Sequence, residues 1–365
     1  MPYFEFKNIK ISAVASAVPT KIVKSTDFNE KFTPEGVDKF VDMTGVREHR
    51  ATGEYQTASD LGYAAAEKIL SEKNVDRSSV GAVIFGAHST DYRRPATACV
   101  LHKRLGLSKE CAAFDVSLGC SAFVYCIQTA AAMMQCSDID KALVIVGETM
   151  TKMVNENDKS AVMLFGDGGA AALLEKTEEP ADIKGLLRSD GNGYKAIIAP
   201  AGGFRNMNAS PEPILWQDGN PRTLYNTNMN GTDVFAFTIS DVPRAIKDFL
   251  KKTETTVEDY DCYAMHQANQ FIHKQLSKKL KMNMDKMPLC LDRYGNTSAP
   301  AIPLTLCDAY GGDTADRNMN VLMCGFGVGL SWGVASAQIN TADIFPVIET
   351  DEYFAEGIIN SPEDM

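Results

Sequence analysis

Two continuous apolar runs constrain the fold of this chain more than any other feature of its sequence. They cover residues 80–87 (VGAVIFGA) and 141–147 (KALVIVG). Neither run alternates apolar and polar residues, and a strand without alternation is covered on both of its faces. Stretches with helical periodicity lie between these runs, for example over residues 57–72. The pattern predicts a layered α/β protein in which helices sandwich each sheet.

The chain divides into two similar halves and a tail. Each half ends in buried strands with helices between them, and the 365 residues suffice for two domains or one two-lobed unit. We expect an N-terminal half over residues 1–178, a C-terminal half over 179–340 and an acidic extension over 341–365, which has no lysine or arginine. Among the smaller elements, residues 25–43 predict a helix and residues 288–291 a short strand.

Composition excludes several classes of protein. A net charge of -11 argues against nucleic acid as a partner. No apolar run has transmembrane length, and residues 1–10 lack a signal-peptide core, so we expect a cytoplasmic protein without membrane insertion. The nine cysteines show no CxxC and no metal-ligand spacing, which favours reduced thiols over disulfides or a metal site.

A cysteine at a predicted strand-to-helix junction is the first candidate for chemistry. Residues 112–116 have strand character, and residues 121–134, rich in Ala, Met, Ile and Gln, predict a buried helix. Cys120 lies between them, where the partial positive charge of the helix N-terminus favours the thiolate, the nucleophilic form of the group. A small thiol buried in the core is the alternative.

Two downstream segments supply the groups that a thiol nucleophile needs. His266 follows an apolar run, and Asn296 lies in a Gly-Asn-Thr-Ser turn. A thiol with a histidine and an asparagine is a recurring arrangement for acyl transfer. Residues 327–329 (GVG) offer backbone N–H groups suited to an oxyanion hole.

Together, six motifs resemble β-ketoacyl-[acyl-carrier-protein] synthase III, a condensing enzyme of the thiolase superfamily. They are TGVR at residues 44–47, AFDV at 113–116 with Cys120, FGDG at 165–168, HQAN at 266–269, DRYGNTS at 292–298 and GVGLSWG at 327–333. The resemblance covers about residues 9–339. It implies a five-layered α/β/α/β/α thiolase fold, a homodimer, and chemistry without a metal or organic cofactor, because the thioester and the leaving CO2 supply the driving force.

The resemblance also assigns roles to residues. Cys120 would take the acyl group of a primer thioester, either acyl-CoA or an acyl carrier. His266 and Asn296 would bind the thioester carbonyl of a malonyl-type extender and stabilise the enolate left by decarboxylation. Backbone N–H groups of Cys120 and Val328 would hold the oxyanion of the acyl-cysteine. Further substrate contacts are expected from Phe235, Asn269, Phe326 and Gly327. FGDG is expected to shape the fold rather than the reaction.

Departures from the family pattern predict a specialised relative. Enzymes that prime with acetyl-CoA sandwich the adenine between a tryptophan and an arginine, and here Lys39 and Met43 stand at those positions. Arg94 replaces a phenylalanine that reaches the acyl pocket of the partner subunit. It either turns outward to pair with an acid such as Asp91, or points inward to a polar group on the primer. The insertion around residues 205–222 and the acidic tail lack counterparts in the short housekeeping enzymes.

A lysine stripe indicates a protein partner. Lys274, Lys278 and Lys281 fall at i, i+4 and i+7 of a predicted helix and therefore share one face. An acidic acyl carrier protein would complement that face in an otherwise acidic chain. A solvated helix face without a partner is the alternative.

Three other functions remain open from the sequence. A thiolase would need a second reactive cysteine in the C-terminal glycine-rich loop; Cys324 is nearby, but Phe326 occupies the thiolase position. An acyltransferase-only relative would move the acyl group to an amine or alcohol without decarboxylation. A catalytically idle heterodimer partner is the non-enzymatic alternative, against which the intact Cys120, His266 and Asn296 argue.

Overall fold

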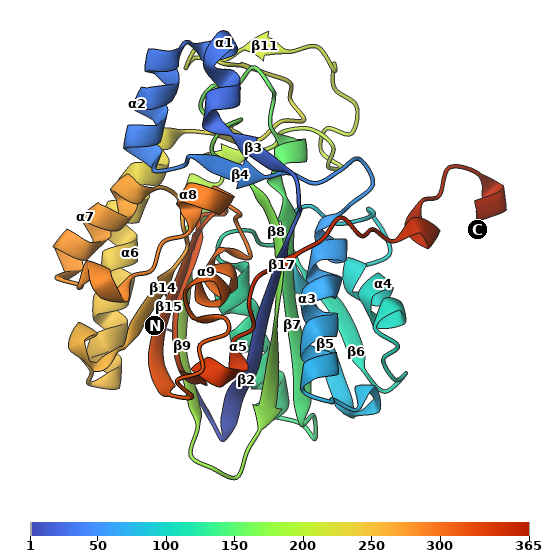
Figure 1. Ribbon diagram of the computed structural model, residues 1–365, viewed down its shortest axis with the longest axis vertical. Helices are drawn as coiled ribbons and strands as arrows, with labels where there is room; N and C mark the ends of the chain where they lie inside the picture. Colours follow the sequence, from blue (N-terminus) through green and yellow to red (C-terminus); the bar gives the residue numbers. More distant parts are fainter. Residues whose placement is uncertain (1, 365) are drawn as a thin grey trace.

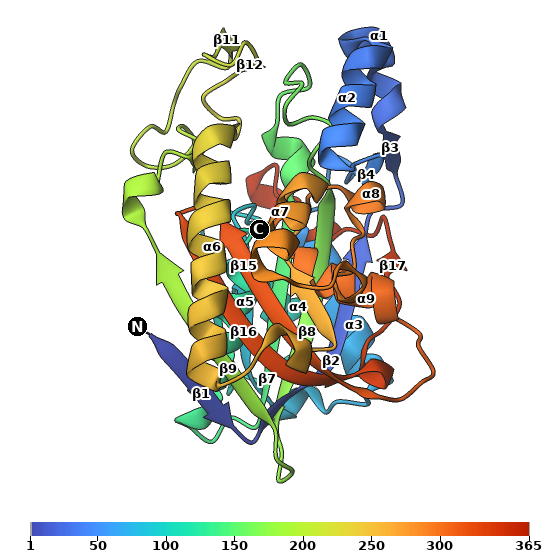
Figure 2. The same ribbon diagram turned by 90° about the vertical axis from the view of Figure 1, so that its left-hand side faces the viewer.

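The computed structural model describes residues 2–364 and shows two β-sheets stacked between three layers of helices (Figure 1). The outer face of the first sheet is covered by α3 (Ala58–Glu72) and α4 (Thr97–Arg104). The layer between the sheets holds α5 (Ala122–Gln135) and α9 (Ala301–Tyr310). The outer face of the second sheet is covered by α6 (Gly231–Thr253) and α7 (Gln270–Leu280) (Figure 2). These five α/β/α/β/α layers are the ones that the resemblance predicts.

The first sheet has the strand order β17-β2-β8-β7-β5-β6. Its strands are β2 (Ile9–Val18), β5 (Val80–Gly86), β6 (Ala112–Val116), β7 (Lys141–Thr149), β8 (Asp167–Lys176) and β17 (Ile348–Glu349). The two apolar runs of the sequence form β5 and β7, which are parallel neighbours inside the sheet. Helices cover both of their faces, which explains why these strands show no alternation.

The second sheet repeats the topology of the first. Its order is β1 (Tyr3–Lys7), β9 (Asp182–Ser189), β16 (Ser331–Asn340), β15 (Asn318–Gly327) and β14 (Cys262–Met265). In the first sheet β8 is antiparallel to β2 and β7, and β7 is parallel to β5. In the second sheet β16 is likewise antiparallel to β9 and β15, and β15 is parallel to β14. The two halves are therefore similar. The boundary predicted at residues 178–179 falls in the connection between β8 and β9.

Helix sequences match the layers in which the helices lie. The central helix α5 is apolar around most of its circumference because it lies between two sheets. By contrast, α6 is amphipathic: Asn230 caps its N-terminus, and Phe237 and Phe249 are buried on the side that packs against the second sheet. None of the helices described over residues 2–364 is both long and apolar enough to cross a membrane.

Small elements gather at one end of the two sheets (Figures 1 and 2). They are α1 (Asn29–Phe32), α2 (Pro34–Thr44), β3 (Ile22–Lys24), β4 (Glu48–Arg50), α8 (Leu291–Tyr294), β10 (Ile197–Ile198), β11 (Ile214–Leu215), β12 (Pro221–Arg222) and β13 (Asn228–Met229). The hairpin β11–β12 and the pair β10–β13 belong to the predicted insertion and its flanks. This end of the molecule also carries the candidate site.

The acidic tail packs on the first half as far as Gly357, and its last residues project from the body at the right of Figure 1. β17 adds to β2 as a parallel edge strand, and Glu349 forms an ion pair of 2.8 Å with the buried Arg50. Further on, the backbone N–H of Phe354 donates to the Asp60 carboxylate, and Glu356 pairs with Lys103. The tail is therefore an ordered part of the fold.

Two predicted elements are wrong. Residues 25–43 form a 3₁₀ turn, α1 and α2 rather than one helix, because Thr33 adopts a φ of 62° immediately before Pro34. Residues 288–290 are not a strand. The N–H groups of Cys290 and Leu291 donate to the side chain of Gln267, each at 3.0 Å, instead of to a neighbouring strand.

Candidate active site

A cavity of about 380 Å³ brings residues of both halves together. Cys120, His266 and Asn296 all line it, more than a hundred residues apart in the sequence. Its walls are mainly apolar and include Met150, Met153, Phe165, Ile197, Ile198, Met229 and Val234. Such a space suits a hydrocarbon chain attached to one of the three polar groups.

Cys120 lies in the turn between β6 and α5, directly before the helix-capping residue Ser121. Its sulfur is 3.5 Å from the hydroxyl oxygen of Ser298 and also receives the backbone N–H groups of Cys120 and Val328. Gly327 closes the other side: a methyl group there would lie 2.8 Å from the sulfur. Only glycine at this position leaves the sulfur free to react.

Burial decides the protonation of this thiol. Desolvation raises the pKa of Cys120 to about 11; the hydrogen bond with Ser298 lowers the pKa, and the charge of Glu148 raises it further. The helix N-terminus was expected to favour the thiolate, but the net pKa shift in the unloaded site has the opposite direction. Loss of hydration is the largest cause of the shift, since Cys120 is only 8% exposed.

The raised pKa predicts the pH dependence of Cys120 modification. Far below its pKa, the thiolate fraction rises tenfold with each pH unit, so alkylation by iodoacetamide should accelerate about tenfold per unit between about pH 7 and pH 10. Peptide mass spectrometry follows Cys120 separately from the exposed Cys99 and Cys136. A rate that levels off near neutral pH would contradict this result.

His266 is held at the end of β14 as a neutral imidazole. Its backbone N–H donates to Cys324 at 2.8 Å, and the ring meets Phe326 edge-on with centroids 5.2 Å apart. Desolvation lowers the pKa of His266 to about 3, nearby His273 lowers it too, and a backbone hydrogen bond at Ser298 opposes them. A neutral imidazole can donate a hydrogen bond without carrying charge into the cavity.

Asn296 is fixed by backbone bonds across the FGDG turn. Its N–H donates to Leu164 at 2.8 Å, and its carbonyl accepts from Gly166 at 3.1 Å. The side-chain oxygen accepts from the Ser298 N–H at 2.9 Å, which turns the amide so that its NH2 group can donate elsewhere. A methyl group on Gly166 would lie 2.1 Å from the carbonyl oxygen of Tyr294, so this approach requires glycine.

Asp167, the acidic residue of the FGDG turn, stabilises the fold beside the cavity. Asp167 is fully buried, and its carboxylate accepts the backbone N–H groups of Thr52 and Thr151 at 2.8 and 2.9 Å. Asp167 does not line the cavity. It connects β8 to the segments that carry Thr52 and Thr151. This agrees with the interpretation that the motif shapes the fold.

Other predicted site residues fall into two groups. Phe326, Gly327 and Val328 line the cavity. Phe235 and Asn269 do not: Phe235 stacks on the exposed Phe271 at 5.6 Å, and Asn269 caps α7 by accepting the N–H of Ile272. Lys274, Lys278 and Lys281 are exposed along α7 and at its C-terminal cap.

Arg94 is exposed and does not line the cavity of its own chain. Within residues 2–364 Arg94 forms no ion pair with Asp91, whose carboxylate instead accepts the hydroxyl of Ser59 at 2.8 Å. A role for Arg94 in the cavity of a partner subunit stays a prediction.

Several lining residues carried no signal in the sequence. Ser298 belongs to the DRYGNTS motif but was assigned no role from the sequence. His88 belongs to a polar loop and was assigned none either. Met150, Met153 and Met229 come from segments that showed no periodicity pointing to a pocket. The contacts that assemble this wall are long-range.

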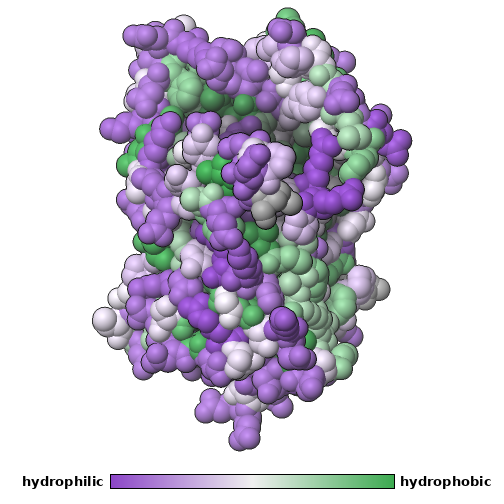
Figure 3. All heavy atoms as spheres, turned by 90° about the vertical axis from the view of Figure 1, so that its right-hand side faces the viewer, coloured by the Kyte–Doolittle hydropathy of each residue, from purple (hydrophilic) through white to green (hydrophobic). Residues whose placement is uncertain are grey.

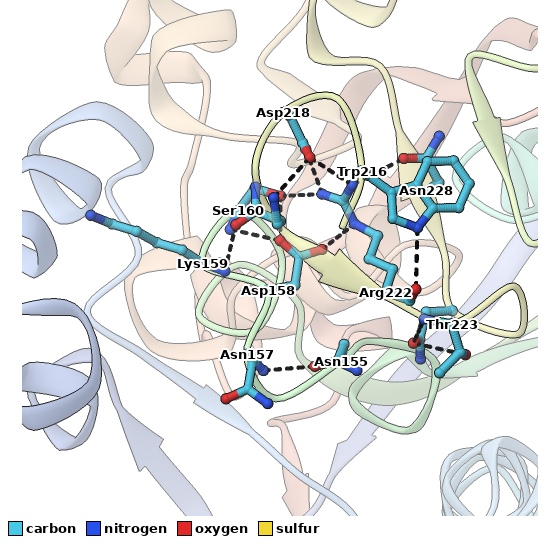
Figure 4. A network of polar contacts seen from close by, with 12 residues as sticks. Asn155, Asn157, Asp158, Lys159, Ser160, Trp216, Asp218, Arg222, Thr223 and Asn228 are labelled. Carbon is cyan, nitrogen blue, oxygen red and sulfur yellow. Dashed lines mark hydrogen bonds and ion pairs between the residues drawn. The ribbon is translucent and has the colours of Figure 1, made fainter. Parts of the chain in front are cut away.

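One wall of the cavity is built on a buried ion-pair network (Figure 4). Fully buried Arg222 of β12 donates through Nε to the equally buried Asp158, and through Nη2 to Asp218 at 2.7 Å. Its Nη1 donates to Asn228 at 3.1 Å. The network joins the insertion to the loop before the FGDG turn, and the adjacent cavity residues Met153 and Thr227 are bonded to each other at 2.8 Å.

Comparisons with known proteins agree on one family. The family model of 3-oxoacyl-[acyl-carrier-protein (ACP)] synthase III matches residues 114–191, and the model of its C-terminal part matches residues 250–339. The chain is 32% identical to beta-ketoacyl-[acyl-carrier-protein] synthase III of Clostridium beijerinckii over 89% of this chain and 97% of that protein. The corresponding protein of Caldanaerobacter subterraneus is 34% identical over 88% of this chain and 95% of its own length.

A solved structure extends the likeness to more of the chain. The crystal structure of a 3-oxoacyl-(acyl-carrier protein) synthase from Burkholderia xenovorans superimposes with a TM-score of 0.91 at 32% identity. The match covers 96% of this chain and 99% of that one. It therefore spans a larger share of this chain than either sequence relative does.

Proposed function

The chain belongs to the 3-oxoacyl-[acyl-carrier-protein] synthase III family of condensing enzymes, and on that premise we propose that it joins a primer acyl group to a malonyl-type thioester with loss of CO2. The observation that supports this reaction best is the cavity itself. It holds a nucleophilic thiol, two neutral donors from the other half and a pair of backbone N–H groups at the sulfur.

The first step transfers the primer to Cys120. Its sulfur bonds to the thioester carbonyl carbon, the bond from that carbon to the carrier sulfur breaks, and the thiol proton leaves with the released carrier thiol. The Ser298 hydroxyl, 3.5 Å from the sulfur, is placed to relay this proton. The N–H groups of Cys120 and Val328 stabilise the oxyanion of the tetrahedral intermediate.

The second step removes CO2 from the extender. The bond between the malonyl carboxylate and its α-carbon breaks, and the electron pair spreads onto the thioester oxygen. His266 and the NH2 group of Asn296 donate to that oxygen as the charge develops. Neutral donors suit this step, because a cationic imidazole would bind the malonyl carboxylate and stabilise the ground state instead.

The third step forms the product. The α-carbon attacks the acyl carbon on Cys120, and the Cys120 thiolate leaves and takes up a proton from solvent. The thioesters and the departing CO2 supply the driving force, so we propose that no metal or organic cofactor takes part. The thiolase alternative is disfavoured because Cys324 is fully buried in β15 and does not line the cavity.

The reaction is tested by following Cys120 and CO2 together. The enzyme is incubated with a panel of acyl-CoA and acyl-carrier thioesters, and intact-protein mass spectrometry identifies the adduct. Malonyl thioester is then added, and the 3-oxoacyl product and CO2 are measured. Acyl loading followed by transfer to an amine or alcohol without CO2 would support the acyltransferase alternative, and no loading at all the idle-partner alternative.

We propose that an acidic acyl carrier protein docks on α7. Exchanging Lys274→Glu and Lys278→Glu together should raise KM for a carrier-bound extender roughly fivefold to tenfold at low salt, because like charges would then meet. The matched control is Lys251→Glu with Lys252→Glu. These lysines lie about 20 Å along α6 from Thr238, which lines the cavity. An unchanged KM in the α7 variant, or equal effects in both pairs, would rule this docking face out.

We propose that β6 forms the interface of a homodimer. It is the free edge of the first sheet, with Ala112 exposed and the next four residues half-buried. Figure 3 looks at this side of the molecule, where a band of apolar residues interrupts the hydrophilic surface. An unpaired apolar edge of this kind favours pairing with a second chain. Analytical ultracentrifugation tests the proposal.

A further inference from the structure

A second histidine faces the cavity beside the nucleophile. His88 follows β5 and lines the same space as Cys120. Its ring packs on Gly119: a methyl group there would lie 2.9 Å from Cδ2 of His88 and 3.0 Å from the hydroxyl oxygen of Ser298. The ring therefore lies beside the residue that directly precedes Cys120, so the acyl group on the sulfur is the part of a substrate nearest to it.

A buried carboxylate fixes the loop that carries this ring. Glu148, at the end of β7, is fully buried and accepts the backbone N–H groups of His88 and Ser89 at 2.9 and 3.0 Å. The hydroxyl of Ser89 donates to the same carboxylate at 2.5 Å. Hydrogen bonds to a buried charge hold a backbone firmly. The position of His88 is therefore set before any substrate binds.

One polar atom of this ring has no partner. Nε2 of His88 is buried and has no hydrogen bond among residues 2–364. A buried polar atom without a partner is unfavourable, and such atoms in a binding cavity are commonly satisfied by the ligand. The hydroxyl of Ser298 lies on the same side of Gly119 as the ring, but it does not hydrogen-bond Nε2.

We propose that Nε2 of His88 hydrogen-bonds an oxygen on the third carbon of the primer acyl chain, so that the site selects 3-hydroxyacyl primers. The proposal rests on the acylation of Cys120 proposed above. The third carbon of a primer is two bonds from the acyl carbon that Cys120 carries. The His88 ring packs on Gly119, directly before Cys120, and so lies on the side of the cavity where this part of the primer is held. A hydroxyl group serves either tautomer of the ring, because it can donate to a bare Nε2 or accept from a protonated one.

Paired primers of equal length test the selection. The rates at which 3-hydroxybutyryl-CoA and butyryl-CoA acylate Cys120 are measured by intact mass, and their ratio is compared between variants. His88→Phe keeps an aromatic ring but removes the polar atom, and should lower the hydroxy-to-plain ratio about tenfold. His88→Gln, which keeps a donor and an acceptor, should restore part of the ratio. His102→Phe, the same exchange at a histidine of α4 that does not line the cavity, should not change it.

Each outcome decides something different. A ratio that stays the same in His88→Phe, or that falls equally in His102→Phe, overturns the role of His88 while acylation of Cys120 stands. No adduct on Cys120 of the parent enzyme with any thioester overturns the proposed function instead. If His88→Phe does not fold, the ratio in His88→Gln relative to His88→Ala decides the question in the same way.

Discussion

His266→Ala and Asn296→Ala should each lower the rate of CO2 release roughly 10²–10³-fold while Cys120 still accepts the primer. Each variant removes one donor to the oxygen on which charge develops, and loss of one such donor costs about this factor. The two neutral donors come from the second half, whereas the oxyanion N–H of Cys120 belongs to the first. Acylation and decarboxylation are therefore expected to separate.

Single-turnover kinetics measures the separation. Cys120 is first loaded and the adduct is confirmed by mass, and malonyl thioester is then added while CO2 is followed. Cys120→Ala is the matched control, which should show no adduct. Full condensation by Asn296→Ala would contradict the roles assigned here.

Arg222→Met should lower the free energy of unfolding by about 3–5 kcal/mol, the range measured when one partner of a buried ion pair is removed. Asp158 is fully buried beside Arg222 and would be left as a buried charge without its cation. Asp218, on the same guanidinium, is 42% exposed and can turn to water. The cost therefore comes mainly from Asp158.

Denaturant unfolding with a double-mutant cycle checks this account. Arg205→Met is the control, an exposed arginine of the same insertion that should change stability by less than about 0.5 kcal/mol. Adding Asp158→Asn to Arg222→Met should recover part of the loss, because it removes the unpaired charge. An Arg222→Met protein as stable as the control would show that the network does not hold the cavity wall.

The sequence predicted the fold best where strands are covered on both faces. The apolar runs of β5 and β7 could be recognised because their composition follows from burial alone. Residues 25–43 were misjudged because Pro34 interrupts an otherwise helical pattern. The short strands β10–β13 were not located, since two-residue pairings leave no periodicity.

For the site, the motifs predicted which residues take part but not how burial shifts their pKa values. Cys120, His266 and Asn296 meet in one cavity, whereas the direction of the Cys120 pKa shift was missed. That shift depends on how much solvent the packed walls exclude, which local sequence does not encode. His88 was missed as well, because Glu148, the residue that fixes its loop, lies sixty residues further along the chain.

The strand added by the tail limits how copies of this chain can grow into larger assemblies. β17, the bridge between Val14 and Ile344, and the bond from Thr350 to Val18 occupy the outer edge of β2. At this edge another chain would meet only the two residues of β17, whereas β6 offers a five-residue edge for strand pairing. Pairing of two β6 strands about a twofold axis uses that edge in both copies, so the addition stops at two. In the homodimer proposed above, the acidic tail would act as a terminator that keeps strand pairing from continuing into a polymer.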